Sequence, residues 1–373
     1  MPLSEARCPR LEPDPGTVVA LLGPGRVGGA LLKRFRHQSD SPRLVAIANS
    51  CEMLLGRNLG EQDWLNDGDS DRTETSLNRM VAWLQQFDGA NAVVIDATAS
   101  REVARHHAEW LKQGLAVVTA NKWALAAEEN YWHALNDLWQ QDRSRYLASA
   151  TVGAGLPALP TLLRLRQAGE TIHAVSGALS GTMTFLCRRV GAGISPSEAL
   201  AEAIDAGLAE PDPRHDLDGL DVARKLVILA RASGYRLSLN EIQVTSLVPP
   251  RLRQVPLPEF LAARDEFDAF WQDCVDQAQG QGDQIAFVGR FKAKERARAG
   301  LQRIDTDHPL STLAGAANLI EIRTDCYRAA PLWVAGPGAG IEVTALALWS
   351  DLLQSANARY SPAEIEQAVG RGQ

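Results

Sequence analysis

Residues 17–29 read TVVALLGPGRVGG, an unbroken apolar run that leads straight into a glycine-rich turn. Such a run is typical of a strand buried on both faces of a parallel sheet. Gly23, Gly25 and Gly28 have the GxGxxG spacing, which permits a tight turn, close approach of the backbone to a pyrophosphate, and close packing of helix on strand. With a helix expected to follow as far as about His37, the stretch predicts a Rossmann-type dinucleotide-binding domain.

Three further apolar runs are expected to form parallel strands of the same sheet, at residues 43–48, 91–97 and 115–119. The first of them ends at Asn49 and Ser50, where NAD-preferring proteins usually carry an acidic residue for the ribose 2′-hydroxyl. Because a neutral strand end does not repel a 2′-phosphate, NADP is the expected cofactor and NAD the alternative. Arg26 and Arg57 are candidates for binding that phosphate.

Beyond residue 150 the chain mixes helices and strands and predicts an α+β domain. The expected elements are helices 158–168 and 195–206 and strands 172–179, 284–291, 297–304 and 318–327. The last three strands follow one another through short turns, which predicts antiparallel neighbours and a sheet suited to a homodimer contact. Near the end, a glycine turn at 336–340 and a helix to Leu353 are expected to return to the first domain. The expected organisation is a tail at 1–16, a dinucleotide-binding domain at 17–150 completed by 336–373, and a substrate-binding and dimerisation domain at 151–335.

The composition excludes several classes of protein. With 373 residues, 45% of them hydrophobic, the chain can fill two cores. Its net charge is −7, with both signs interleaved, so nucleic-acid and anionic-membrane partners are not expected. Five scattered cysteines in no metal-binding or CxxC spacing favour reduced thiols and a cytoplasmic protein. Neither a signal peptide nor an apolar run long enough to span a membrane is present.

An acidic segment follows at residues 207–231, with the sequence GLAEPDPRHDLDGLDVARKLVILAR. Asp221 and Lys225 are four residues apart on a predicted helix, so their side chains share one face. Taken alone, such a pair is expected to be a surface ion pair. Glu210, Asp216 and other acids lie immediately upstream, however, so carboxylates and a lysine converge on one turn and suggest a site for a small polar ligand.

The chemistry suggested by these two domains is hydride transfer involving a small carbonyl or alcohol. No cysteine or histidine stands where it would serve as a catalytic nucleophile or acid. His106 and His107 are adjacent on a predicted helix, point about 100° apart and are expected at the surface. Lysine is therefore the expected proton donor to a developing alkoxide, with Lys225 and Lys122 as candidates.

Several sequence motifs of the chain resemble those of the homoserine dehydrogenase family, over nearly its whole length. The motifs are GPGRVGG, TANK (119–122), TVGAGLP (151–157), SGTMTF (180–185), the acidic segment, and GPGAGIEVTA (336–345). It looks most like the dehydrogenase half of bifunctional aspartokinase-homoserine dehydrogenases, here expected to be monofunctional. The resemblance implies NAD(P)-dependent interconversion of L-aspartate 4-semialdehyde and L-homoserine in threonine and methionine biosynthesis.

The resemblance also implies roles for individual residues. Lys225 polarises the aldehyde oxygen and donates its proton, Lys122 assists, and Asp221 orients the substrate and tunes Lys225. The implied substrate-binding residues are Glu210, Asp216, Gly181 and Thr182. The implied cofactor-binding residues are Gly23, Gly25, Arg26, Val27, Gly28, Asn49, Ser50, Thr98, Lys122 and Gly340. The backbone carbonyls of Val152, Ala154 and Leu156 are implied ligands of a monovalent cation.

The chain departs from the family pattern at three places. Ser149 replaces a glutamate that helps to hold the cation in some relatives, and Leu208-Ala209 replace Tyr-Thr. His215 stands where an aspartate is usual, and we expect it to have a modest effect on substrate affinity.

Two other readings remain open at this point. A catalytically silent dinucleotide-binding regulatory homologue is disfavoured because both lysines are present. A dehydrogenase for another amino-acid semialdehyde is the second alternative, and an assay with homoserine separates all three.

Overall fold

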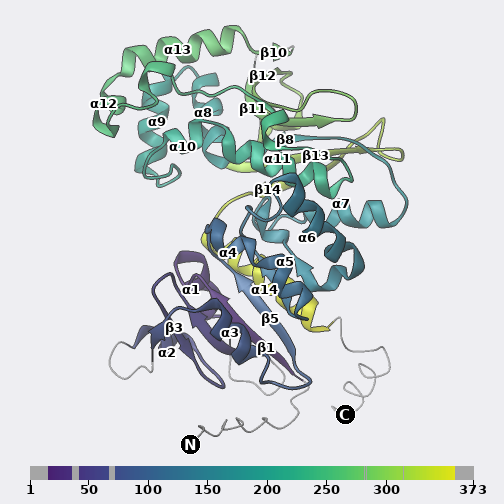
Figure 1. Ribbon diagram of the computed structural model, residues 1–373. Coiled ribbons are helices and arrows are strands. Elements are labelled where there is room, and N and C mark those ends of the chain that lie inside the picture. Colours follow the sequence, from purple (N-terminus) through teal and green to yellow (C-terminus); the bar gives the residue numbers. More distant parts are fainter. Residues whose placement is uncertain are drawn as a thin grey trace, which may run out of the picture. The chain divides into compact units, whose positions relative to one another are not determined.

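The computed structural model describes residues 16–35, 42–66, 72–280, 282, 284–313 and 315–357, and Figure 1 labels its elements. The chain divides into two compact units. The first comprises residues 1–124, 130–148 and 344–373, and the second comprises residues 125–129 and 149–343.

The first unit is built on a seven-stranded sheet in the order β4-β3-β2-β1-β5-β6-β7. Its strands are β1 (Thr17–Leu22), β2 (Arg43–Ala48), β3 (Glu52–Leu55), β4 (Thr73–Glu74), β5 (Asn91–Asp96), β6 (Ala116–Thr119) and β7 (Tyr146–Leu147). The run from β2 to β7 is parallel, and β3 and β4 extend it in antiparallel fashion. All six residues of β1 are buried, as predicted, because this strand lies at the centre of the sheet.

Helices flank this sheet in the first unit: α1 (Arg26–Leu32), α2 (Glu61–Leu65), α3 (Leu77–Leu84), α4 (Arg101–Arg105), α5 (His107–Lys112), α6 (Glu129–Gln141) and the larger part of α14 (Ile341–Asn357). Two of the contacts that hold α14 join it to residues far away in the sequence. The Asn91 amide donates to the Ser355 carbonyl at 3.2 Å, and the rings of Phe35 and Trp349 meet edge to face at 5.2 Å. Residues from the two ends of the chain thus share one core.

The second unit contains another seven-stranded sheet, in the order β10-β12-β11-β8-β13-β14, with β9 paired to β12. Its strands are β8 (Ile172–Ala178), β9 (Gln243–Val244), β10 (Gln279–Gly280), β11 (Gln284–Lys292), β12 (Arg298–Ile304), β13 (Ala317–Thr324) and β14 (Leu332–Pro337). Its helices are α7 (Ala158–Gln167), α8 (Gly181–Gly191), α9 (Pro196–Asp205), α10 (Arg214–Leu217), α11 (Leu220–Ala232), α12 (Leu257–Ala262) and α13 (Arg264–Asp276).

This architecture confirms the predicted fold class, a Rossmann-type sheet plus an α+β unit, and corrects several details. The first helix ends at Leu32, and the predicted end near His37 lies outside the described residues. β3 and β4 extend the sheet beyond the strands that the apolar runs predicted. β11 and β12 are antiparallel neighbours as predicted, whereas β12 and β13 are not, because β11 and β8 lie between them.

Candidate active site

The glycine turn after β1 needs glycine for reasons visible in the backbone. Gly23 has φ +84°, which L side chains rarely adopt, and a Cβ there would lie 2.8 Å from the Thr98 methyl group. A Cβ on Gly28 would lie 2.1 Å from the Gly23 carbonyl oxygen. The turn and the start of α1 are therefore packed as closely as the predicted dinucleotide fingerprint requires.

A pocket of about 810 Å³ opens above this turn in the first unit. Its volume suits a large ligand, and the close-packed glycine turn in its wall fits a dinucleotide. Five of the predicted cofactor residues line it, namely Gly23, Gly25, Asn49, Ser50 and Thr98. Arg26, Val27 and Gly28 form the first turn of α1 beside it. Thr75, Ser76 and Asn78 also line the pocket and were not predicted. The run of hydroxyl and amide side chains between β4 and α3 was the signal that could have identified them.

Asn49 closes the turn that follows β2. Its side-chain oxygen accepts hydrogen bonds from the backbone N–H groups of Cys51 and Glu52, at 2.7 and 2.8 Å. The amide oxygen is thus committed to the turn, and the NH₂ group is the part of this side chain that a ligand would meet.

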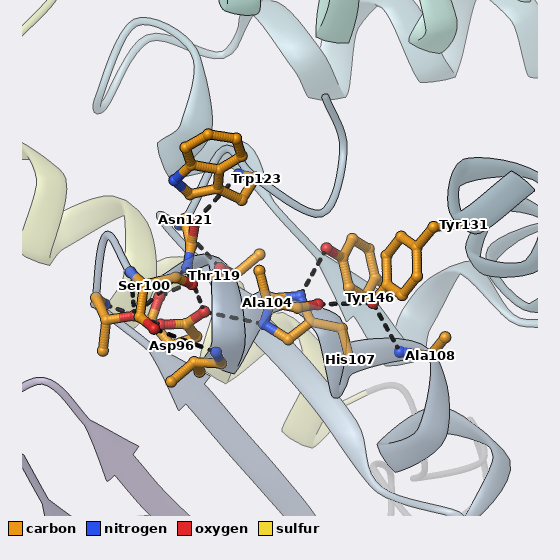
Figure 2. Close-up of polar contacts among 12 residues, drawn as sticks. Asp96, Ser100, Ala104, His107, Ala108, Thr119, Asn121, Trp123, Tyr131 and Tyr146 are labelled. Carbon is orange, nitrogen blue, oxygen red and sulfur yellow. Dashed lines mark hydrogen bonds and ion pairs between the residues drawn. The ribbon is translucent and has the colours of Figure 1, made fainter. Parts of the chain in front are cut away.

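Asp96, at the carboxyl end of β5, is the centre of a buried hydrogen-bond network (Figure 2). One carboxylate oxygen accepts from the N–H and the hydroxyl of Thr98 at 2.8 and 2.6 Å, and the other accepts from His107 and Asn121, each at 2.9 Å. His107 also meets the Tyr146 hydroxyl at 3.1 Å. The prediction that His107 lies at the surface is wrong: α4 ends before it, and its side chain is 0% exposed. His106 is half-buried and lines the pocket.

Lys122 follows this network directly along the chain. Its neighbour Asn121 donates to the Ser100 carbonyl at 2.8 Å as well as to Asp96, and accepts from the Trp123 N–H at 3.0 Å. The backbone that carries Lys122 is therefore fixed at the carboxyl edge of the sheet, and the lysine itself is partly exposed.

In the second unit, α11 carries the predicted pair of Asp221 and Lys225. The Lys225 ammonium lies 2.8 Å from the Asp221 carboxylate and donates to the Leu179 carbonyl at 2.7 Å. The lysine side chain is 10% exposed and that of Asp221 is 41% exposed. The pair is thus partly desolvated, unlike the solvated surface pair that the spacing alone would suggest.

A second set of hydrogen bonds connects α8, α10 and the loop that precedes α10. The Thr182 hydroxyl lies 3.1 Å from Asp216 and 2.8 Å from the Leu208 carbonyl, and the other Asp216 oxygen accepts from the Glu210 N–H at 2.8 Å. Burial raises the pKa of Asp216 above its usual value. Gly181 is required at the start of α8 because a Cβ there would lie 2.7 Å from the Ala316 carbonyl oxygen.

Two family models match the sequence that builds these sites. Residues 157–353 match homoserine dehydrogenase, and residues 23–149 match the NAD-binding domain of homoserine dehydrogenase. The chain belongs to the homoserine dehydrogenase family.

Individual homoserine dehydrogenases agree with that assignment. The chain is 36% identical over 356 residues to bifunctional aspartokinase/homoserine dehydrogenase 2, chloroplastic, of Zea mays, which covers 92% of this chain and 39% of that protein. It is 35% identical over 346 residues to bifunctional aspartokinase/homoserine dehydrogenase 2 of Escherichia coli, covering 90% and 42%. The chain thus spans about two fifths of the length of these relatives. A hyperthermophilic archaeal homoserine dehydrogenase of known structure, 23% identical, shares the fold with a TM-score of 0.69 over 92% of this chain and 98% of that chain.

The turn predicted to bind a monovalent cation is tightly wound. Gly153 and Ala154 both have positive φ, +78° and +51°. Val152, Ala154 and Leu156 are buried, and the Leu156 carbonyl accepts from the Ala158 N–H at 2.8 Å. Among the described residues, no cluster of three or more acidic, histidine or cysteine side chains could hold a metal ion.

Two other acids of the loop bind to the chain itself. Asp212 pairs with Arg214 at 2.6 Å. Asp218 accepts from the Leu220 N–H at 2.7 Å, next to Gly219, which is the N-cap of α11 with φ +73°. His215 is exposed.

The remaining predicted site residue, Gly340, has φ +137° and ends the loop after β14. In the same loop, a Cβ on Gly338 would lie 2.0 Å from the Asn318 side chain. No described helix combines the length and the hydropathy needed to cross a membrane. The cysteines within the described residues, Cys51, Cys187, Cys274 and Cys326, carry free thiols.

Proposed function

We propose that this protein is an active homoserine dehydrogenase, which interconverts L-aspartate 4-semialdehyde and L-homoserine with NAD(P) in threonine and methionine biosynthesis. Family membership supports the reaction class. The observation that carries the proposal is the Lys225 ammonium, which is largely buried, paired with Asp221 at 2.8 Å and bonded to the Leu179 carbonyl at 2.7 Å.

The proposed chemistry uses the third N–H of that ammonium. An ammonium group has three donors, and Asp221 and Leu179 take two of them. The third would donate to the substrate carbonyl oxygen and deliver a proton as it becomes an alcohol. A nicotinamide cofactor, when bound, would supply the hydride for that reduction or accept it in the reverse direction. Glu210 and Asp216 would hold the substrate amino group, with Gly181 and Thr182 beside them, and Lys122 would assist in positioning.

The two units divide the work in this proposal. The first unit, completed by the end of the chain, would bind the dinucleotide in the pocket above Gly23, with Lys122 contacting its nicotinamide half. Gly340 belongs to the second unit and is the remaining residue proposed to contact the cofactor. The second unit would bind substrate and form a homodimer. The hyperthermophilic archaeal homoserine dehydrogenase, whose structure was solved in complex with NADPH, shares the fold and is compatible with that assignment.

A single assay tests the function: homoserine-dependent reduction of NADP and of NAD. Turnover with homoserine, and none with homologous hydroxy-amino acids, is the expected result. Failure of the parent protein to turn over with either cofactor would reject the proposal. Dinucleotide binding without turnover would identify a catalytically silent regulatory homologue instead.

We also propose a preference for NADP. The pocket wall at the end of β2 offers the NH₂ group of Asn49 and the hydroxyl of Ser50 and no carboxylate, and donors suit a 2′-phosphate. The ratio of kcat/KM for the two cofactors tests this preference.

Three further properties are proposed on narrower grounds. The homodimer would use the face of the second sheet on which Arg290, Glu321 and Arg323 line a hollow of about 440 Å³. Light scattering would report a monomer if this proposal is wrong. A monovalent cation would bind the carbonyls of Val152, Ala154 and Leu156. Equal activity in potassium and tetramethylammonium salts would exclude a cation requirement.

The free thiols favour a cytoplasmic location.

A further inference from the structure

The network around Asp96 lies beneath the pocket wall, and neither a substrate role nor a catalytic role accounts for it. Asp96, His107 and Tyr146 are each 0% exposed, and none of them lines the pocket. A buried carboxylate is costly unless its oxygens are fully hydrogen-bonded. Here four donors serve two oxygens, so the ionised form is satisfied by the chain itself.

The consequence for Thr98 is specific. Its hydroxyl donates to Asp96 at 2.6 Å and accepts from the Ser100 N–H at 3.1 Å, so its polar atoms face the protein interior. Its methyl group faces the glycine turn, 2.8 Å from the position a Cβ would take on Gly23. Asp96 therefore selects one rotamer of a residue in the pocket wall.

The same carboxylate connects the ends of two strands. Asn121, after β6, donates both to Asp96 and to the carbonyl of Ser100, and Ser100 is the N-cap of α4. Residues 98–100 all line the pocket. They are held from one side by Asp96 and from the other by Asn121.

His107 and Tyr146 continue the hydrogen-bond network on the buried side of Asp96 (Figure 2). The ionised Asp96 requires an N–H on the Nε2 atom of His107. Burial raises the pKa of Tyr146 well above its usual value, so its hydroxyl keeps its proton and can donate to the Nδ1 atom of a neutral ring. The neutral Nε2–H tautomer thus satisfies both contacts.

We propose that Asp96, His107 and Tyr146 are positioning residues for the dinucleotide: they fix the Asp96 carboxylate, and through Thr98 and Asn121 they fix the pocket wall formed by residues 98–100. This inference rests on the proposed dinucleotide role of the first unit. It does not depend on the identity of the substrate.

The test measures the Kd of NADPH and of NADH by fluorescence titration, with circular dichroism to verify folding. Tyr146→Phe removes one hydroxyl from the network and should weaken binding about threefold, and His107→Leu should weaken it about tenfold or more. His107→Gln keeps an N–H donor for Asp96 and should recover binding to within about threefold of the parent.

Tyr131→Phe is the matched control. The Tyr131 hydroxyl lies in the same region but bonds to the backbone, donating to the Ala104 carbonyl at 2.6 Å and accepting from the Ala108 N–H at 3.3 Å (Figure 2). Its loss should leave the Kd unchanged, although the melting temperature falls about as far as in Tyr146→Phe.

Two results would overturn the proposal: a parental Kd in folded His107→Leu, or equal weakening by Tyr131→Phe and Tyr146→Phe. If His107→Leu does not fold, the pair of tyrosine variants decides. A parent that binds dinucleotide without oxidising homoserine would refute the proposed activity and leave this inference to be judged on binding. A parent that binds neither dinucleotide would refute both.

Discussion

The carboxylates of the two units are used in opposite ways. Asp96 in the first unit is fully buried and all its hydrogen bonds come from the chain. In the second unit, Glu210 is exposed and Asp221 is 41% exposed, and Asp216 is partly buried with a raised pKa. A carboxylate buried among four donors of the chain fixes structure, whereas one whose side chain is partly exposed can be reached by a ligand. The exposure of each carboxylate separates the two roles where residue type does not.

The sharpest test of this contrast is Lys225→Met, which keeps the length of the side chain and removes the charge. If the partly exposed pair of Asp221 and Lys225 takes part in catalysis, kcat should fall by about 10²- to 10⁴-fold, the usual contribution of a general acid. Steady-state kinetics measure it. Lys112→Met, at an exposed position of α5, is the control and should retain parental kcat.

The buried carboxylate of Asp96 should matter most for stability. Asp96→Ala leaves four buried donors without their acceptor and should lower the free energy of unfolding by about 3 kcal/mol or more. Glu210→Ala, at an exposed position, should change it by less than about 0.5 kcal/mol. Urea denaturation measures both free energies of unfolding. An equal decrease in the two variants would contradict the proposed difference between the carboxylates of the two units.

Adding a carboxylate to the pocket wall of the first unit tests the proposed preference for NADP. Asn49→Asp introduces a charge where a 2′-phosphate would bind, so the ratio of kcat/KM for NADP to that for NAD should fall about tenfold or more. Asn49→Ala removes the amide without adding charge and should shift the ratio less. An unchanged ratio in Asn49→Asp would show that the phosphate binds elsewhere.

The smallest expected effect concerns Asp216 and pH. Since burial raises its pKa in the folded protein, the unfolded chain releases this proton first as pH rises from about 4. Below the pKa of the unfolded chain, the ionisation of Asp216 does not affect the free energy of unfolding. As pH rises from there to the pKa of the folded protein, Asp216 lowers the free energy of unfolding more and more. Relative to Asp216→Asn, the parent should lose stability as pH rises from about 4 to the raised pKa of Asp216 in the folded protein. A pH-independent difference in urea denaturation would contradict this.

The sequence was most informative where local rules and tertiary structure agree. An unbroken apolar run and three glycines predict β1, the tight turn and α1, because steric demands on glycine are set by a few neighbouring residues. The i,i+4 spacing likewise brings Asp221 and Lys225 together without knowledge of the fold.

Long-range partners could not be predicted in the same way. His107 was assigned to the surface because adjacent histidines on one helix do not chelate, yet α4 ends before it, and Asp96 and Tyr146 bury it from elements distant in sequence. Similarly, β8 lies between β11 and β13 although more than a hundred residues separate it from either. Strand order depends on contacts that no local pattern records.

The discontinuity of the first unit has a consequence for synthesis on the ribosome. Its sheet is complete once β7 emerges, but α14, whose Ser355 carbonyl accepts from Asn91, follows after residues 149–343 have been made. At about 5 to 20 residues per second, that interval lasts about 10 to 40 s. During this time the nascent first unit exposes the surface that α14 will cover, while the second unit is still being made. Chaperone binding to ribosome-bound chains should therefore concentrate on this interval and end with the last helix.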